Sequence, residues 1–90
     1  MSTREHLLIL VTDNLQASDG LLVKAKASAK SARMALRELA QTEKKEKESE
    51  EFYSLSSVVE DLESWIEDSR KGVQDILERY WADVEKVENL

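Results

Sequence analysis

The sequence predicts an all-α protein, folded as an antiparallel hairpin of two long helices with a coiled-coil-like seam. Three observations predict this fold. The chain has no proline among its 90 residues, apolar residues recur at alternating spacings of three and four, and this repeat changes phase once, near the middle, within a polar stretch. A chain of this length forms at most one small domain, so we expect a single helical domain over residues 1–90.

The first helix is expected over residues 3–44. Ser2, followed three residues later by Glu5, is typical of a capping box, which satisfies free amides where a helix begins. Residues 18–20 (Ser-Asp-Gly) are also compatible with a helix break, which leaves a three-helix bundle as the alternative fold. The repeat of this helix is apolar at nine of ten positions: Leu8, Val11, Leu15, Ser18, Leu22, Ala25, Ala29, Ala32, Leu36 and Leu39.

The second helix is expected over residues 50–89. Ser49 is a suitable N-cap, and Glu50 and Glu51 would lie at the positive end of the helix dipole. The repeat continues to the end of the chain and is apolar at ten of twelve positions: Phe52, Leu55, Val59, Leu62, Ile66, Ser69, Val73, Ile76, Tyr80, Asp83, Val87 and Leu90.

A polar turn is expected over residues 45–49. The first repeat, extended by two heptads from Leu36, reaches Glu50, whereas the second begins at Phe52. A coiled coil does not readily absorb a shift of two residues, so the chain is expected to reverse direction here. Residues 21–45 carry seven bases and two acids, and residues 46–69 carry nine acids and one base, which favours antiparallel pairing. The expected levels are Lys24 with Asp68, Lys26 with Glu67, Lys30 with Glu63, and Arg33 with Glu60.

Small residues of the first helix are expected to face large residues of the second. Ala25, Ser28, Ala29 and Ala32 would form a small-residue groove, and Trp65 would fill it. Small against large lets two layers interdigitate at the density of a protein core. Trp65 is therefore the expected anchor of the hairpin.

Each helix also carries a second apolar stripe, which an isolated hairpin would leave in water. Large exposed apolar patches mark interaction sites, so we expect the hairpin to complete a four-helix bundle by self-association or with other helical chains. The residues expected at this partner interface are Leu7, Leu8, Val11, Leu21, Val58, Trp65, Leu77, Tyr80, Trp81 and Val84.

The composition argues against catalytic chemistry. The chain has no cysteine and a single histidine, His6, and its two glycines lie far apart, so it lacks a thiolate nucleophile, cysteine metal ligands and a phosphate-binding loop. A di-iron bundle would need a Glu-x-x-His motif, which is absent. We expect no enzyme, no catalytic, metal or cofactor site, and no small-molecule substrate. The net charge of −6 and the lack of aromatic residues among the basic ones argue against direct nucleic-acid binding.

The apolar run over residues 7–11 is too short for a secretory signal or a membrane span. The expected location is therefore the cytoplasm or the nucleus, without membrane insertion. The predicted function is that of a non-catalytic scaffold subunit in a multi-subunit coiled-coil assembly. The alternative is a small acidic adaptor or chaperone that sequesters an amphipathic helix of a client protein.

Overall fold

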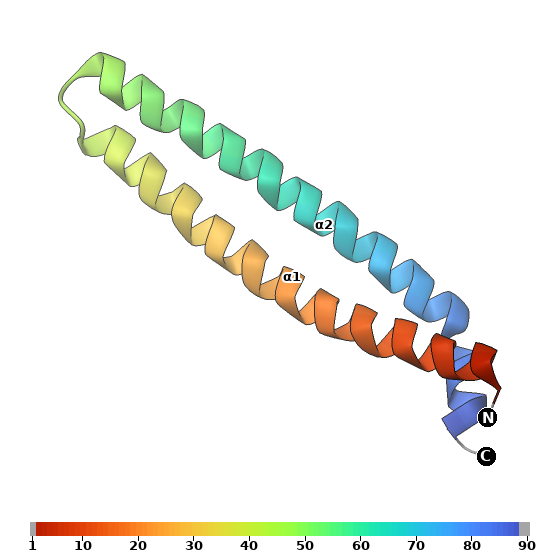
Figure 1. Cartoon of the computed structure of the whole chain (residues 1–90). Coiled ribbons are helices and arrows are strands. Elements are labelled where there is room, and N and C mark those ends of the chain that lie inside the picture. Colours follow the sequence, from red (N-terminus) through yellow and green to blue (C-terminus); the bar gives the residue numbers. More distant parts are fainter. Residues whose placement is uncertain (1, 89–90) are drawn as a thin grey trace.

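The computed structural model describes the backbone of residues 2–88 and the side chains of residues 2–81. It contains two helices, α1 (Thr3–Thr42) and α2 (Glu46–Glu88), which pack antiparallel as a hairpin (Figure 1). The Cα atoms extend over 66 × 16 × 14 Å. The molecule is thus a rod, two helices wide and one helix thick.

Helix α1 begins at the predicted capping box. The Glu5 amide donates to Ser2 Oγ (3.2 Å), and the Ser2 amide donates to Glu5 Oε2 (3.1 Å). The helix then continues without interruption through residues 18–20, so the three-helix alternative is wrong. Neither polar side chain in this segment caps a new helix: the Ser18 hydroxyl donates back to the Asn14 carbonyl (2.9 Å), and Asp19 accepts from Arg70 of α2 (3.0 Å).

The turn is shorter and earlier than expected, because it occupies residues 43–45 rather than 45–49. The Glu43 carboxylate accepts from the Lys45 amide (3.2 Å), which supports the reversal. Ser49 is not the N-cap of α2, which begins at Glu46 rather than at residue 50. Its hydroxyl donates instead to the Ala40 carbonyl of α1 (2.6 Å). Ser49 thereby satisfies one of the carbonyls that the end of α1 leaves without a helical partner.

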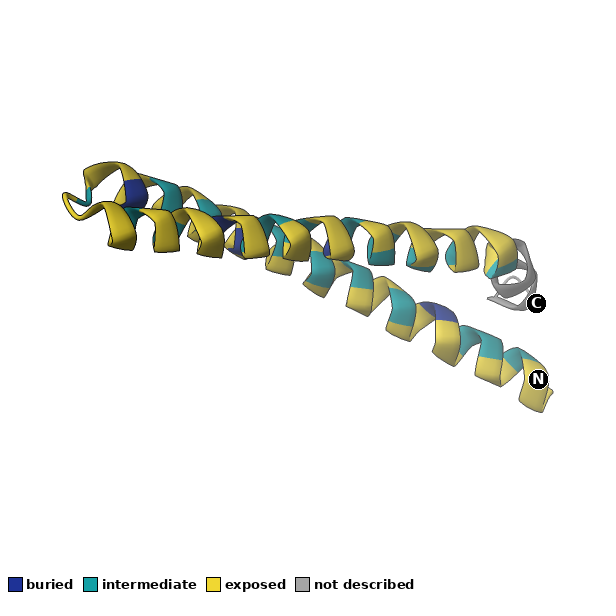
Figure 2. Cartoon of the chain, turned by 90° about the horizontal axis from the view of Figure 1, so that it is seen from above, coloured by how far each residue is buried: buried dark blue, intermediate teal, exposed yellow. Residues whose placement is uncertain are grey.

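The two helices wind around each other. Near the turn they lie apart in Figure 1 and overlap in Figure 2, whereas at the open end they overlap in Figure 1 and lie apart in Figure 2. On each helix, one set of buried and half-buried residues recurs at a strict seven-residue period, the pattern that produces a left-handed supercoil. We call these residues the hairpin seam: Leu8, Thr12, Leu15, Asp19, Leu22, Lys26, Ala29, Arg33, Leu36 and Ala40 of α1, with Ser49, Phe52, Ser56, Val59, Glu63, Ile66, Arg70, Val73, Leu77 and Tyr80 of α2.

The hairpin seam shares only every second position with the predicted apolar repeat. The other positions are taken by the next residue along the chain, for example Thr12 in place of Val11 and Glu63 in place of Leu62. Each helix is therefore rotated by about 50°, half of the 100° between successive helical residues, from the predicted orientation. With this rotation, charged side chains lie in the seam and pair across the helices. Five large apolar residues of the predicted repeat are instead 39–48 % exposed: Val11, Leu39, Leu55, Leu62 and Ile76.

The same rotation removes Trp65 from the hairpin core. Its side chain is 64 % exposed, whereas the adjacent Ile66 is 3 % exposed. Since two successive residues cannot face the same neighbour on a helix, seating Ile66 in the seam turns Trp65 outward. The prediction that Trp65 anchors the hairpin is therefore wrong, and Ile66 takes that place.

The buried core of the hairpin is thin. Among the described side chains, those that are buried are Thr12, Ala29, Ala40, Ser56 and Ile66. Two of them are hydroxyl residues, whose oxygens donate to carbonyls of their own helix: Thr12 Oγ1 to Leu8 (3.1 Å) and Ser56 Oγ to Tyr53 (2.8 Å). Among the described residues, Ile66 is thus the one large apolar side chain that is buried between the two helices.

Candidate interaction surface

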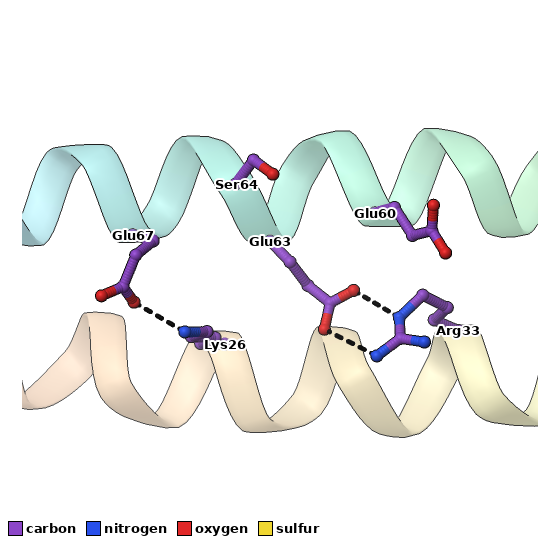
Figure 3. Close-up of a pocket in the computed structure, with 6 residues that line it drawn as sticks. All are labelled: Lys26, Arg33, Glu60, Glu63, Ser64 and Glu67. Atoms are coloured by element: carbon purple, nitrogen blue, oxygen red, sulfur yellow. Dashed lines mark hydrogen bonds and ion pairs between the residues drawn. The ribbon is translucent and has the colours of Figure 1, made fainter.

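One side of the hairpin is lined by ion pairs between the helices (Figure 3). Arg33 Nε donates to Glu63 Oε2 (2.5 Å) and Arg33 Nη2 to Glu63 Oε1 (3.4 Å), in a bidentate pair whose side chains are largely buried. Lys26 Nζ donates to Glu67 Oε2 (2.6 Å), as the sequence predicted.

The pairing of the arginines differs from the prediction by about one helical turn. Arg33, expected level with Glu60, reaches Glu63, and Glu60 pairs with Arg37 instead. The side chains of Lys24, Lys30 and Asp68 are exposed. Among the described residues, the predicted pairs Lys24–Asp68 and Lys30–Glu63 are not formed as hydrogen bonds or ion pairs.

A further pair has the opposite polarity, with its acid on α1 and its base on α2. Arg70 Nε donates to Asp19 Oδ1 (3.0 Å), and both side chains are about three-quarters buried. Counting charges over long segments missed this pair, because Arg70 follows an acidic stretch and Asp19 precedes a basic one. A position-by-position search for opposite charges at the seam spacing would have found it.

Two members of these ion pairs, Glu67 and Arg70, have shifted pKa values. The hydrogen bond from Lys26, reinforced by its positive charge, lowers the pKa of Glu67. The hydrogen bond to Asp19 raises the pKa of Arg70. Within residues 2–81, no three acidic or histidine side chains converge as metal ligands would. The charged side chains instead pair the two helices with each other, at Lys26–Glu67, Arg33–Glu63 and Asp19–Arg70.

The opposite side of the hairpin carries most of the large exposed apolar side chains. These stand one position before a hairpin seam residue, and one position is a rotation of about 100°, whereas Val23, Tyr53 and Trp81 stand one position after the seam. Because the helices are antiparallel and face each other, the same rotation from the seam on each helix points to the same side of the hairpin. The residues that precede the seam on α1 and those that precede it on α2 therefore share one side. Residues one position after the seam, such as Arg37 and Glu60, lie on the ion-paired side. We call the apolar residues that stand one position before the seam the apolar face: Leu7, Val11, Leu21, Ala25, Ala32, Ala35 and Leu39 of α1, with Leu55, Val58, Leu62, Trp65 and Ile76 of α2.

The apolar face contains five of the ten residues predicted at the partner interface. These are Leu7, Val11, Leu21, Val58 and Trp65, and Leu21, Val58 and Trp65 are each more than 60 % exposed. The remaining predicted residues lie elsewhere. Leu8, Leu77 and Tyr80 are half-buried in the hairpin seam, Trp81 lies on the ion-paired side, and the side chain of Val84 falls outside the described residues.

Five large residues of the apolar face were assigned by the sequence to the contact between the two helices: Val11, Leu39, Leu55, Leu62 and Ile76. A signal that could have placed them was present. A charged or hydroxyl residue directly follows three of them: Thr12, Ser56 and Glu63. Of these, Glu63 pairs across the hairpin with Arg33.

Comparison of the chain with protein-family models, with curated proteins and with solved structures finds no match. Within the described residues, neither helix carries an apolar stretch long enough to cross a membrane.

Proposed function

We propose that this chain is a non-catalytic helical assembly subunit, whose apolar face binds the helices of another polypeptide and completes a four-helix bundle. The observation that carries this proposal is the position of the predicted apolar repeat. On each helix, one half of the repeat lies in the hairpin seam and the other half lies on the apolar face.

That division is the one expected of a four-helix bundle. There each helix has two neighbours at roughly right angles, and its apolar stripe points between them, toward the common axis. A two-helix coiled coil would instead centre the stripe on its single neighbour. In this hairpin the stripe is half covered, so the arrangement has room for a second pair of helices.

The size of the uncovered surface supports the same function. From Leu7 to Leu39 the apolar face runs for about 48 Å along α1, at 1.5 Å per residue. Isolated apolar side chains are common on protein surfaces, whereas apolar side chains gathered along one face mark an interaction site. On α1 the polar residues Asn14, Ser18 and Ser28 interrupt this face. The thin core of the hairpin would also gain from the apolar area that a partner buries.

The alternative function, sequestering a client helix, is favoured by a different observation. Three aspartates spaced seven residues apart, Asp61, Asp68 and Asp75, run along the outer edge of α2 beside the apolar face, and all three are exposed. They suit a client helix that carries basic residues along one edge. In that case one hairpin would bind one client helix rather than a second pair of helices.

Two charge substitutions of α1 test whether the apolar face binds protein. Leu21, 66 % exposed, lies on the apolar face, whereas Met34, 58 % exposed, lies on the outer side of α1 away from it. In cross-linking from the native cell, Leu21→Glu should remove the helical chains captured by the wild type, and Met34→Glu should retain them. Equal capture by the two variants would contradict the proposal. Far-ultraviolet circular dichroism of both variants checks that the helices persist.

A further inference from the structure

The two halves of the apolar face differ in side-chain size. Over residues 25–35, α1 presents small side chains: Ala25, Ser28, Ala32 and Ala35. The α2 side chains beside this segment are large: Leu55, Val58, Leu62 and Trp65. The ion pairs Lys26–Glu67 and Arg37–Glu60 place the two segments at the same level along the rod.

Within one hairpin these stripes lie side by side and cannot fill each other. We infer that the partner seated on the apolar face is a second copy of this chain, related by a two-fold axis along the rod, with both turns at the same end. This inference rests on the proposed function and names its partner. The rotation lays α1 of each copy over α2 of the other while keeping every residue at its level. Small residues then meet large ones twice, in a self-complementary interface.

In this arrangement Trp65 enters the groove between Ala25 and Ser28 of the other copy. The complementarity of Trp65 and the small-residue groove, which fails inside the hairpin, is thus met between two hairpins. A large aromatic side chain seated in a desolvated pocket is the usual energetic centre of an interface.

The charges at the edge of the apolar face favour the same arrangement. Lys24 of α1 and Asp68 of α2 are exposed at matching levels on the outer edges of the two helices. The two-fold rotation along the rod brings Lys24 of one copy beside Asp68 of the other. The reverse arrangement, with α2 over α2 and the turns at opposite ends, would instead bring together the Asp61, Asp68 and Asp75 edges of both copies, which repel.

The available area is sufficient for a stable dimer. A face about 48 Å long on a rod whose Cα width is 16 Å offers on the order of 800 Å² per copy, which is the standard size of a specific interface. Other partners of the same face are outcomes of the tests below.

The first test is the mass of the purified full-length chain by light scattering coupled to size exclusion. One chain is 10.3 kDa, so a dimer has about twice that mass. Wild type and Met34→Glu should be dimers, and Leu21→Glu and Val58→Glu should be monomers with retained helicity. A monomeric wild type at about 100 μM, a concentration that would saturate a micromolar dimer, would overturn the inference. With a monomeric wild type, loss of the captured helical chains in Leu21→Glu would leave the proposed function standing. Unchanged capture in Leu21→Glu would contradict both the proposed function and the dimer.

The second test measures the orientation of the two copies. The chain has no cysteine, so Lys45→Cys in the turn accepts a single spin label. With helices packed about 10 Å apart, both labels of a dimer should lie on the order of 20 Å from each other. A distance near the 66 Å length of the rod would overturn the shared orientation of the turns.

In the Trp81→Phe variant, Trp65 is the sole tryptophan, and its fluorescence emission should shift to shorter wavelength as the dimer forms. Emission typical of a water-exposed indole in the dimer would overturn the packing of Trp65 on the small-residue groove.

Discussion

At the scale of single residues, the hairpin is defined by which of two neighbouring side chains faces the other helix. Ile66 is buried and Trp65 is exposed, although Trp65 has the larger apolar surface. The same choice recurs where Glu63 lies in the seam and Leu62 does not. Large apolar side chains thus lie outside the hairpin next to positions where a charged or hydroxyl side chain occupies the seam.

Truncation of the two neighbours should therefore have unequal effects. Ile66→Ala should lower the free energy of unfolding by about 2–4 kcal/mol, because it empties a closed site in the seam. Trp65→Ala should lower it by less than about 1 kcal/mol in the monomer, where its side chain is solvated. Urea unfolding followed by circular dichroism, at the lowest workable protein concentration, measures both. A loss for Trp65→Ala as large as that for Ile66→Ala would place Trp65 in the core of the single hairpin.

The Glu67 carboxylate gives the hairpin a dependence on pH. Its pKa in the folded state lies below the ordinary value of 4.5 because Lys26 binds the charged form. The unfolded chain therefore takes up this proton first, so the stability from the pair is present above about pH 4.5 and is lost as the pH falls through the lower folded pKa. Between pH 7 and about pH 3, Glu67→Gln should lose less thermal stability than the wild type. Glu51→Gln, which alters an exposed carboxylate without a described ion pair, should behave as the wild type does; identical losses in the two variants would exclude this role for Glu67.

At the scale of helices, the ends of the elements depend on a few hydrogen bonds. The start of α1 was predictable because a capping box is a local pattern, carried by Ser2 and Glu5 alone. The start of α2 was not, since the hydroxyl of Ser49 bonds to a carbonyl of the other helix rather than to its own. A contact between residues of different helices leaves no mark in the local sequence.

The position of the turn predicts a difference between two insertions. Two glycines between Lys44 and Lys45 lengthen an existing loop and should cost about 1 kcal/mol or less. The same insertion between Lys47 and Glu48 interrupts the first turn of α2 and displaces Ser49 from the Ala40 carbonyl. It should cost about 1–2 kcal/mol more, seen as a lower urea midpoint. Equal losses of stability in the two insertion variants would instead support a turn over residues 45–49.

At the scale of the whole molecule, the sequence was sufficient for the hairpin and insufficient for its orientation. Absence of proline, the phase change near residue 46 and the opposite charges of the two halves predicted two antiparallel helices. The apolar repeat was assigned to the contact between them, because a repeat does not reveal how many neighbours share it. The exposure of Val11, Leu39 and Leu62 shows that the repeat is divided between a covered and an uncovered side, and ion-paired residues such as Asp19 and Arg33 lie in the covered seam.

A dimer of hairpins should show its assembly in its melting behaviour. Association stabilises the folded state by mass action, so the melting temperature of the wild type should rise on the order of 5 °C for each tenfold increase in protein concentration. Met34→Glu should show the same rise, and Leu21→Glu should melt at one temperature throughout. A melting temperature of the wild type that is independent of concentration would indicate that the stability resides in the single hairpin.

The ion pair of opposite polarity, between Asp19 and Arg70, also disfavours folding with the two helices out of register. If one arm slipped past the other by seven residues, the apolar side chains would still match. Such a slip would, however, bring Arg33 toward Arg70 or Asp19 toward Glu63, according to its direction. Misaligned hairpins are thus penalised by repulsion. Across evolution, the rod should therefore lengthen or shorten only by gaining or losing matched heptads in both arms at once.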